Sequence, residues 1–151
     1  MLTTSTAKAT TSTANAECSY KRTTPFDKRC SVSQTIRDQY PRRIPVILER
    51  APTANKRTTP TVTQQKFLVP DEFTVGQFLA QVRRIATPTL AKEHAIFLFV
   101  GTGVLPPAVA LMSQIYDRFR DEDGFLYVRY SGENTFGFFE AVLSTLFNLL
   151  S

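Results

Sequence analysis

Apolar residues in the middle of this chain occur in two patterns: short continuous runs, which suit strands, and residues at helical spacing. Two apolar runs, residues 43–49 and 65–69, flank a polar stretch, residues 51–64, and the second run stops at Pro70. Two strands joined by a loop of this size form an antiparallel hairpin. The pattern therefore predicts a hairpin over these two runs.

Helical spacing marks three further segments. Val32 and Ile36 lie four apart and predict a helix over residues 27–39, which ends because the residue before Pro41 is steered away from helix. Thr74 is a natural N-cap for a second helix. Apolar residues of this second helix share one face: Val75, Phe78, Leu79 and Val82. A third helix is predicted after a double proline, with helical spacing of Val109, Met112, Ile115, Tyr116 and Phe119.

Two more strands complete the pattern. Residues 95–100 are continuously apolar, as expected of a buried central strand, and residues 125–130 form the last strand. The predicted order is therefore β-β-α-β-α-β after a helical extension. This order predicts an α+β fold, the ubiquitin-like β-grasp, with a mixed four-stranded sheet packed on a helix. A ferredoxin-like βαββαβ arrangement needs a different order and fits less well.

The two ends of the chain differ from this core. Residues 1–26 are rich in Thr, Ser and Ala without a periodic apolar pattern, which predicts a disordered arm. The arm lacks the apolar core of a signal peptide, and no apolar run reaches the length of about 18 residues that spans a bilayer. We therefore expect an intracellular protein.

Charge is distributed unevenly along the chain. Residues 1–66 hold twelve Lys and Arg against four Asp and Glu, whereas residues 67–151 hold six against nine. This asymmetry favours an acidic partner or surface on the N-terminal side. A basic disordered arm together with a solvated face explains it equally well.

Residues suited to catalysis or metal binding are few. The chain has one histidine, His94, and two cysteines, Cys18 and Cys30, so neither a catalytic triad nor a zinc spacing can be assembled. The acidic run at residues 121–123 lacks the spaced ligands of a calcium loop. The glycine pair within residues 101–103 is too short a motif to cradle a phosphate. We expect no enzyme activity, no metal and no cofactor.

Eight short segments, in order, resemble the autophagy ubiquitin-like modifiers, the family of microtubule-associated protein light chain three and GABARAP. They are Tyr40-Pro-Arg-Arg-Ile-Pro-Val-Ile47, Lys66-Phe-Leu-Val-Pro70, Thr74-Val-Gly-Gln-Phe78, Ala95-Ile-Phe-Leu-Phe-Val100, Leu105-Pro-Pro107, Leu111-Met-Ser113, Asp123-Gly-Phe-Leu-Tyr-Val128 and Tyr130-Ser-Gly-Glu-Asn-Thr-Phe-Gly137. The resemblance covers residues 36–137. It implies a β-grasp core with two N-terminal helices, conjugation to phosphatidylethanolamine and a role on autophagosomal membranes.

Gly137 carries the chemistry that the resemblance implies. A glycine keeps an extended terminus thin enough to thread the channels of a protease, an activating enzyme and a conjugating enzyme. By resemblance, an autophagy cysteine protease recognises Phe136 and Gly137 and cleaves before Phe138. The new carboxylate is then adenylated, passed on as a thioester and joined to the lipid amine. Residues 27–137 would form the ubiquitin-like domain with its helical extension.

The tail after Gly137 departs from the family, whose precursors end soon after this glycine. Residues 138–151 carry nine apolar residues and one charged residue, Glu140. Their polar residues recur at helical spacing, which predicts an amphipathic helix. The tail is either a removable pro-segment that masks an apolar groove or a weak membrane-surface helix. The loop over residues 51–64 is also longer than is usual in the family.

The resemblance further implies a peptide-docking site along residues 66–69. An edge strand there would accept an aromatic-x-x-aliphatic motif of a cargo receptor through its unpaired backbone groups. Arg43 and Lys66 would attract acidic residues that flank the motif. The aromatic pocket would be lined by Ile36, Pro45, Ile47, Lys66, Leu68 and Phe125. The aliphatic pocket would be formed by Phe67, Val69, Pro70, Phe73 and Phe78. Ordinary core packing is the alternative for most of these apolar residues, and spacing does not distinguish the two.

Three functions remain open. The first is the lipid-conjugated modifier, cytoplasmic when made and on autophagosome or vesicle membranes after lipidation. The second is a peptide-binding adaptor that keeps its tail and is not conjugated. The third is the sibling autophagy modifier that is joined to a protein lysine, against which the ending at residues 131–137 argues. No nucleic-acid partner is expected.

Overall fold

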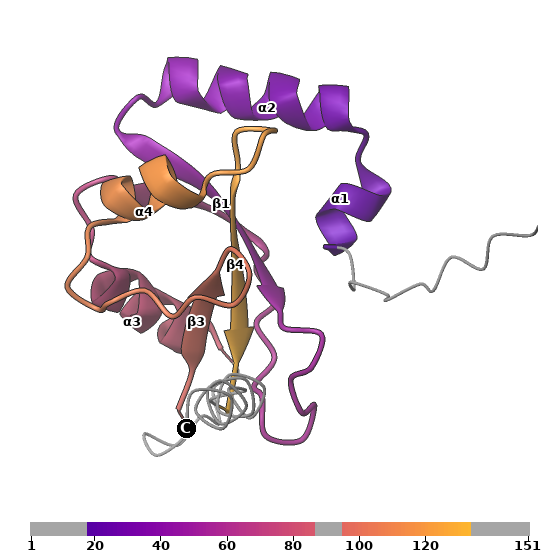
Figure 1. Ribbon diagram of the computed structural model, residues 1–151, viewed down its shortest axis with the longest axis vertical. Helices are drawn as coiled ribbons and strands as arrows, with labels where there is room; N and C mark the ends of the chain where they lie inside the picture. The colour runs from indigo at the N-terminus through magenta and orange to yellow at the C-terminus, as the bar shows by residue number, and fades with distance from the viewer. Residues whose placement is uncertain (1–17, 87–94, 134–151) are drawn as a thin grey trace, which may run out of the picture.

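The computed structural model describes residues 18–86 and 95–133 of the chain (Figure 1). Its helices are α1 (Ser19–Thr23), α2 (Phe26–Gln39), α3 (Val75–Ile85) and α4 (Met112–Phe119). Its strands are β1 (Arg43–Arg50), β2 (Lys66–Pro70), β3 (Phe97–Val100) and β4 (Leu126–Ser131). The predicted order β-β-α-β-α-β after a helical extension is confirmed.

The four strands form one mixed sheet in the order β2-β1-β4-β3. β1 pairs antiparallel with β2, as the hairpin prediction requires, and parallel with β4, which in turn pairs antiparallel with β3. This confirms the predicted fold class. The prediction that residues 95–100 form a central strand is wrong, because β3 lies at an edge of the sheet. Its apolar run reflects burial of both strand faces: Leu98 and Val100 belong to the main core, and Phe99 between them is also buried.

Alternation along the strands creates two apolar layers, one on each face of the sheet. The larger layer joins the sheet to α3 and α4 and includes Val46 and Leu126, neither of which is exposed. The smaller layer joins the opposite face to α1 and α2 through Ile47 and Phe125. Figure 1 shows α2 across the end of the sheet at which β1 begins.

Local sequence explains where α3 begins. The Thr74 side chain accepts a hydrogen bond from the backbone N–H of Gln77 at 3.1 Å, and the Gln77 side chain accepts one from the N–H of Thr74 at 2.8 Å. This reciprocal capping box confirms the predicted N-cap. The prediction for the third helix is wrong at Val109, which precedes α4 and is 84% exposed.

The first helix lies where disorder was predicted. Residues 1–17 of the predicted arm are outside the described residues, but Ser19–Thr23 form α1. The prediction of a disordered arm over residues 1–26 is therefore wrong for its last part. Two N-terminal helices are present, as the family resemblance implies.

Candidate functional site

β2 presents a free edge. It pairs with β1 on one side, and it stands at the end of the strand order, so no strand of the described residues covers its other side. Backbone N–H and C=O groups on such an edge can pair with a strand from another chain. The edge is therefore a geometrically competent docking site for an extended peptide.

Four residues predicted to line the aromatic pocket form two cross-strand pairs. Pro45 lies opposite Leu68, and Ile47 lies opposite Lys66. Residues two apart on a strand point to the same face, so all four side chains share one face of the hairpin. Leu68 is 42% exposed, whereas Ile47 is 1% exposed. The face thus has an apolar floor and an exposed apolar side chain above it.

The remaining two residues of this predicted pocket, Ile36 and Phe125, complete the same layer. Phe125 is buried with Ile47, and Ile36 of α2 packs against them. The layer also contains Tyr20 of α1, whose ring lies 5.5 Å from the Phe125 ring in an edge-to-face arrangement. The Lys66 ammonium lies 5.0 Å from the centre of the Tyr20 ring. Sequence reasoning missed Tyr20, although it is the first aromatic residue in a segment otherwise rich in Thr and Ser.

The residues predicted for the aliphatic pocket lie together, but mostly inside the main core. Phe67, Val69 and Phe78 are 5%, 1% and 1% exposed, and the Phe67 and Phe78 rings are 5.5 Å apart. Pro70 and Phe73 are only partly buried. Because Phe67 and Val69 alternate with Lys66 and Leu68 along β2, they point to the opposite face. Pro70 and Phe73 are therefore the members of this set that can meet a ligand without rearrangement.

Arg43 is exposed at the beginning of β1 and faces the end of β2. Its Nη1 lies 3.5 Å from the carbonyl oxygen of Leu68, and its own carbonyl accepts a hydrogen bond from Arg37 Nη1 at 3.0 Å. Lys66 is exposed at the other end of β2. The two predicted cations thus lie at opposite ends of the edge and place positive charge at both ends of β2.

Glu49 holds α1 beside this site. Its carboxylate accepts the backbone N–H groups of Ser19 and Tyr20 at 3.0 and 3.1 Å, and it also accepts a hydrogen bond from the Gln65 side chain. Burial, reinforced by a hydrogen bond to Glu49, raises the pKa of the Cys18 thiol to about 11. The thiol is therefore protonated at neutral pH.

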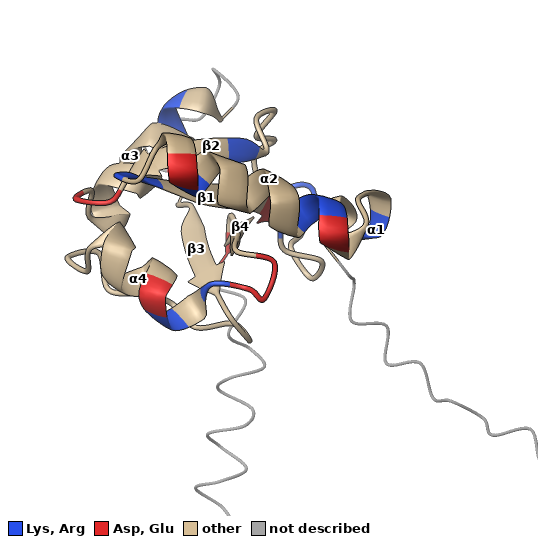
Figure 2. Cartoon of the chain, turned by 90° about the horizontal axis from the view of Figure 1, so that it is seen from above, with Lys and Arg blue, Asp and Glu red and all other residues tan. Residues whose placement is uncertain are grey.

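The acidic turn before β4, residues 121–123, forms ion pairs with both α1 and α2 (Figure 2). Lys21 Nζ lies 2.6 Å from Asp121 Oδ1, and Arg29 Nε lies 2.7 Å from Asp123 Oδ2. Asp123 also accepts a hydrogen bond from Tyr127, and burial together with this bond raises the pKa of the tyrosine. Burial, the largest single effect, would raise the pKa of Asp121, but hydrogen bonds from Lys21 and Asp123 together with the Lys21 charge outweigh it, and the pKa lies below its ordinary value. The acidic run is thus an anchoring point for the helices.

The residues predicted for processing and conjugation, Phe136, Gly137 and Phe138, lie outside the described residues, as does His94. The structure describes the chain leading to them up to Glu133. In the described ranges, no cluster of three His, Cys, Asp or Glu side chains could hold a metal ion. No helix of these ranges has the length and apolar character needed to cross a bilayer.

A hollow of about 300 Å³ opens on the α1 side of the sheet, over β1, β3 and β4, and its lining includes no residue of β2. Its lining includes Glu49, Phe99, Tyr127 and Ile47. Only Ile47 belongs to the predicted peptide-binding residues, so the hollow and the edge are separate features.

Comparisons with known proteins agree with this geometry. Residues 28–137 match the family model described as autophagy protein Atg8, ubiquitin like. The chain is 50% identical over 119 residues to autophagy-related protein 8 of Dictyostelium discoideum, covering 79% of this chain and 93% of that protein. It is 51% identical over 118 residues to autophagy-related protein 8 of Mycosarcoma maydis, covering 78% and 95%. The crystal structure of Trypanosoma brucei ATG8 superimposes with a TM-score of 0.68 at 35% identity, covering 76% of this chain and 94% of that one. The chain therefore belongs to the Atg8 family of autophagy ubiquitin-like modifiers, which are not enzymes.

Proposed function

We propose that this chain is cleaved after Gly137 and joined through that glycine to phosphatidylethanolamine. The family match runs to residue 137, which leaves residues 138–151 as an apolar pro-segment beyond it. A glycine carboxylate offers no side chain to obstruct adenylation or thioester transfer. The partners of these steps are an autophagy cysteine protease, an activating enzyme and a conjugating enzyme. The product moves from the cytoplasm to autophagosome or vesicle membranes.

The second part of the proposal is that the β2 edge recruits cargo receptors. A single observation carries it: exposed Leu68 and Lys66 flank a free strand edge above a buried apolar floor. Strand pairing with the edge supplies affinity that does not depend on peptide sequence. The aromatic side chain of the motif packs on Leu68 and the floor beneath it. The aliphatic side chain packs on Pro70 and Phe73, at the other end of β2.

The conjugation step is tested by intact mass. The chain is recovered from starved cells in soluble and membrane fractions, beside a Gly137→Ala variant. We expect a membrane form that ends at residue 137 and carries the mass of one phosphatidylethanolamine, and we expect the variant to lack it. A full-length chain in both fractions would instead identify an unconjugated adaptor. A gain equal to the mass of a protein would identify conjugation to lysine.

A further inference from the structure

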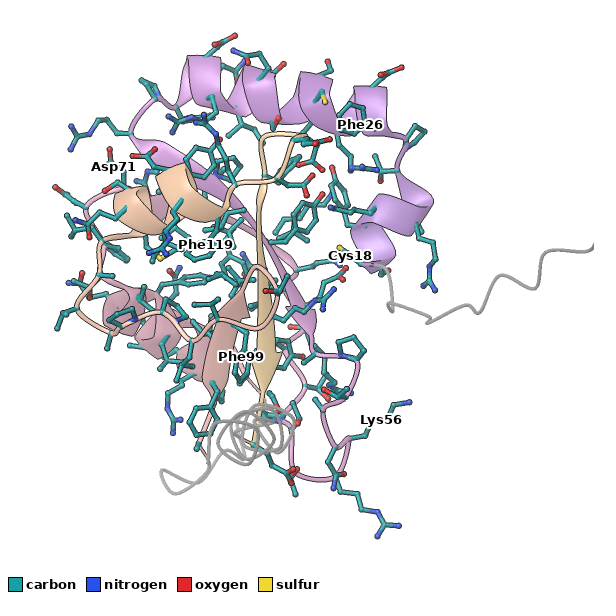
Figure 3. All side chains as sticks on the ribbon, in the orientation of Figure 1. Cys18, Phe26, Lys56, Asp71, Phe99 and Phe119 are labelled. Carbon is teal, nitrogen blue, oxygen red and sulfur yellow. The ribbon has the colours of Figure 1, made fainter. Side chains whose placement is uncertain are left out.

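The loop after β1 and the chain that leaves β4 emerge at the same end of the sheet, where both strands finish. β1 and β4 are parallel neighbours, with Arg50 opposite Tyr130, so their C-terminal ends coincide. Figure 1 shows the loop, residues 51–65, descending beside the end of β4. Figure 3 shows Lys56 on this loop, at the end of the molecule opposite α2.

The loop is fastened to the chain that follows β4. The Thr58 hydroxyl donates to the Glu133 carboxylate at 2.7 Å, and the backbone N–H of Gly132 donates to the Thr59 hydroxyl at 3.1 Å. A Cβ on Gly132 would lie 2.3 Å from the carbonyl oxygen of Thr58, so only glycine permits this approach. The position of the loop is therefore tied to the segment that leads to Gly137.

Two cations on this loop have no ion-pair partner among the described residues. The pentapeptide Lys-Arg-Thr-Thr-Pro occurs twice, at residues 21–25 and 56–60. In the first copy Lys21 pairs with Asp121 at 2.6 Å. In the second copy Lys56 and Arg57 are exposed and form no ion pair with any described residue. The same local sequence is thus used for internal contacts in one place and left facing solvent in the other.

Chain length limits how far these cations can lie from a lipid attached at Gly137. Gly137 is the fourth residue after Glu133, and four steps of extended chain span at most about 14 Å. Glu133 contacts Thr58, the residue next to Arg57. An anchored molecule therefore holds the tip of the loop close to the bilayer surface.

We propose that Lys56 and Arg57 form a membrane-contacting patch that binds anionic lipid headgroups once the chain is anchored. This rests on the proposed lipidation at Gly137 and names the second contact that the anchored protein makes. Each cation near an anionic leaflet strengthens binding roughly fivefold. Arg50 lies beneath the same loop and adds positive charge, whereas Glu133 opposes it. With three cations against one carboxylate, the net charge of these four residues at this end of the sheet remains positive.

The test uses residues 1–137 with the lipid attached chemically to the Gly137 carboxylate, so that the result does not depend on natural conjugation. A fluorophore is placed on the exposed loop at Thr53→Cys in a Cys18→Ser/Cys30→Ser background. Quenching by spin-labelled headgroups is measured on phosphatidylcholine vesicles with and without phosphatidylserine. We expect strong quenching only with the anionic lipid, weakening as salt is raised.

The decisive variant is Lys56→Gln/Arg57→Gln. Its ratio of bilayer-contacting to free orientations on anionic vesicles is expected to fall roughly 25-fold. The matched control, Lys28→Gln/Arg42→Gln, removes the same charge from exposed positions on α2 and just before β1, and it should quench like the parent. Equal quenching of parent and decisive variant, or equal quenching on neutral and anionic vesicles, would overturn the patch. Neither result bears on lipidation itself, which the intact-mass experiment decides.

Discussion

At the scale of single residues, Leu68 is an exposed apolar side chain on the proposed docking edge. It is 42% exposed, so its truncation leaves little empty space in the folded chain. We expect Leu68→Ala to weaken binding of an aromatic-x-x-aliphatic peptide by about 2 kcal/mol, because a peptide docked as proposed buries this side chain. The free energy of unfolding should change by less than about 0.5 kcal/mol. Titration calorimetry and urea unfolding measure the two quantities.

Val109→Ala is the control for this substitution, since Val109 is 84% exposed and lies before α4. It should leave peptide affinity unchanged. If Leu68→Ala binds the peptide as tightly as Val109→Ala does, the aromatic motif residue docks elsewhere.

Arg29 and Asp123 form the most buried ion pair of the described residues. Their side chains are 10% and 0% exposed, and they join α2 to the turn before β4. Removing one member leaves the other charge buried without its partner. Asp123→Asn is therefore expected to lower the free energy of unfolding by about 3–5 kcal/mol.

Asp71→Asn gives the comparison for this pair. Asp71 pairs with Arg42 at 3.2 Å, but the Arg42 side chain is 76% exposed. The loss there should be at most about 1 kcal/mol, because solvent screens the pair. Similar urea midpoints for the two variants would mean that Arg29–Asp123 does not anchor the helix.

At the scale of elements, the predictions succeeded where the signal is local. Thr74 and Gln77 are three residues apart, and their capping box sets the start of α3 from neighbouring residues alone. α1 shows the opposite case. It has five residues, and its contacts with Glu49 and Asp121 bridge about thirty and one hundred positions of sequence. No periodic pattern in residues 19–23 could reveal those contacts.

The same reasoning explains β3 and the docking site. Hydropathy reports that the faces of a strand are buried, but it does not report whether strands lie on both sides. β3 was therefore predicted to be central although it lies at an edge. Likewise, the pattern could not separate exposed Leu68 from buried Phe67 until the pairing with β1 fixed which face each side chain points to.

We expect the folded chain to lose stability at alkaline pH as the thiol of Cys18, at the start of α1, ionises. The pKa of its thiol is about 11 in the folded chain, above the ordinary value of 9.0. A raised folded pKa means that the protonated thiol stabilises the fold below pH 9.0, and that this stability is lost as pH rises from 9.0 towards 11. Urea midpoints of a Cys30→Ser chain should therefore fall across this window.

Tyrosines also titrate at alkaline pH, so the readout is a difference between two chains. A Cys18→Ser/Cys30→Ser chain should lose less stability over the same window. The alkylation rate of Cys18 should rise with a midpoint near its raised pKa. Parallel curves for the two chains would show that the environment of Cys18 does not contribute to this loss of stability.

At the scale of the whole molecule, the sheet separates the two proposed activities. The docking edge lies along β2, whereas the route to Gly137 leaves the sheet at the C-terminal end of β4. β1 lies between these strands and contacts both. A receptor on the β2 edge would therefore not need to displace the chain that leads to the proposed lipid anchor.

The tail after Gly137 raises the question of whether it reaches the proposed peptide site on β2. Residues 138–151 carry nine apolar residues and one charged residue, a composition suited to an apolar groove. If the tail masks the peptide site, a chain ending at Gly137 must bind the peptide more tightly than residues 1–151. Occupancy of about nine tenths by the tail would weaken the apparent affinity about tenfold.

A full-length Leu146→Ser/Phe147→Ser/Leu149→Ser/Leu150→Ser variant separates loss of masking from a mere change of length. It keeps the full length of the tail but replaces four of the apolar side chains that would fill the groove. We expect it to bind the peptide as tightly as residues 1–137 do. Equal affinity of all three chains would exclude masking and favour the interpretation of the tail as a membrane-surface helix, because such a helix acts on lipid and leaves the β2 edge free before and after cleavage.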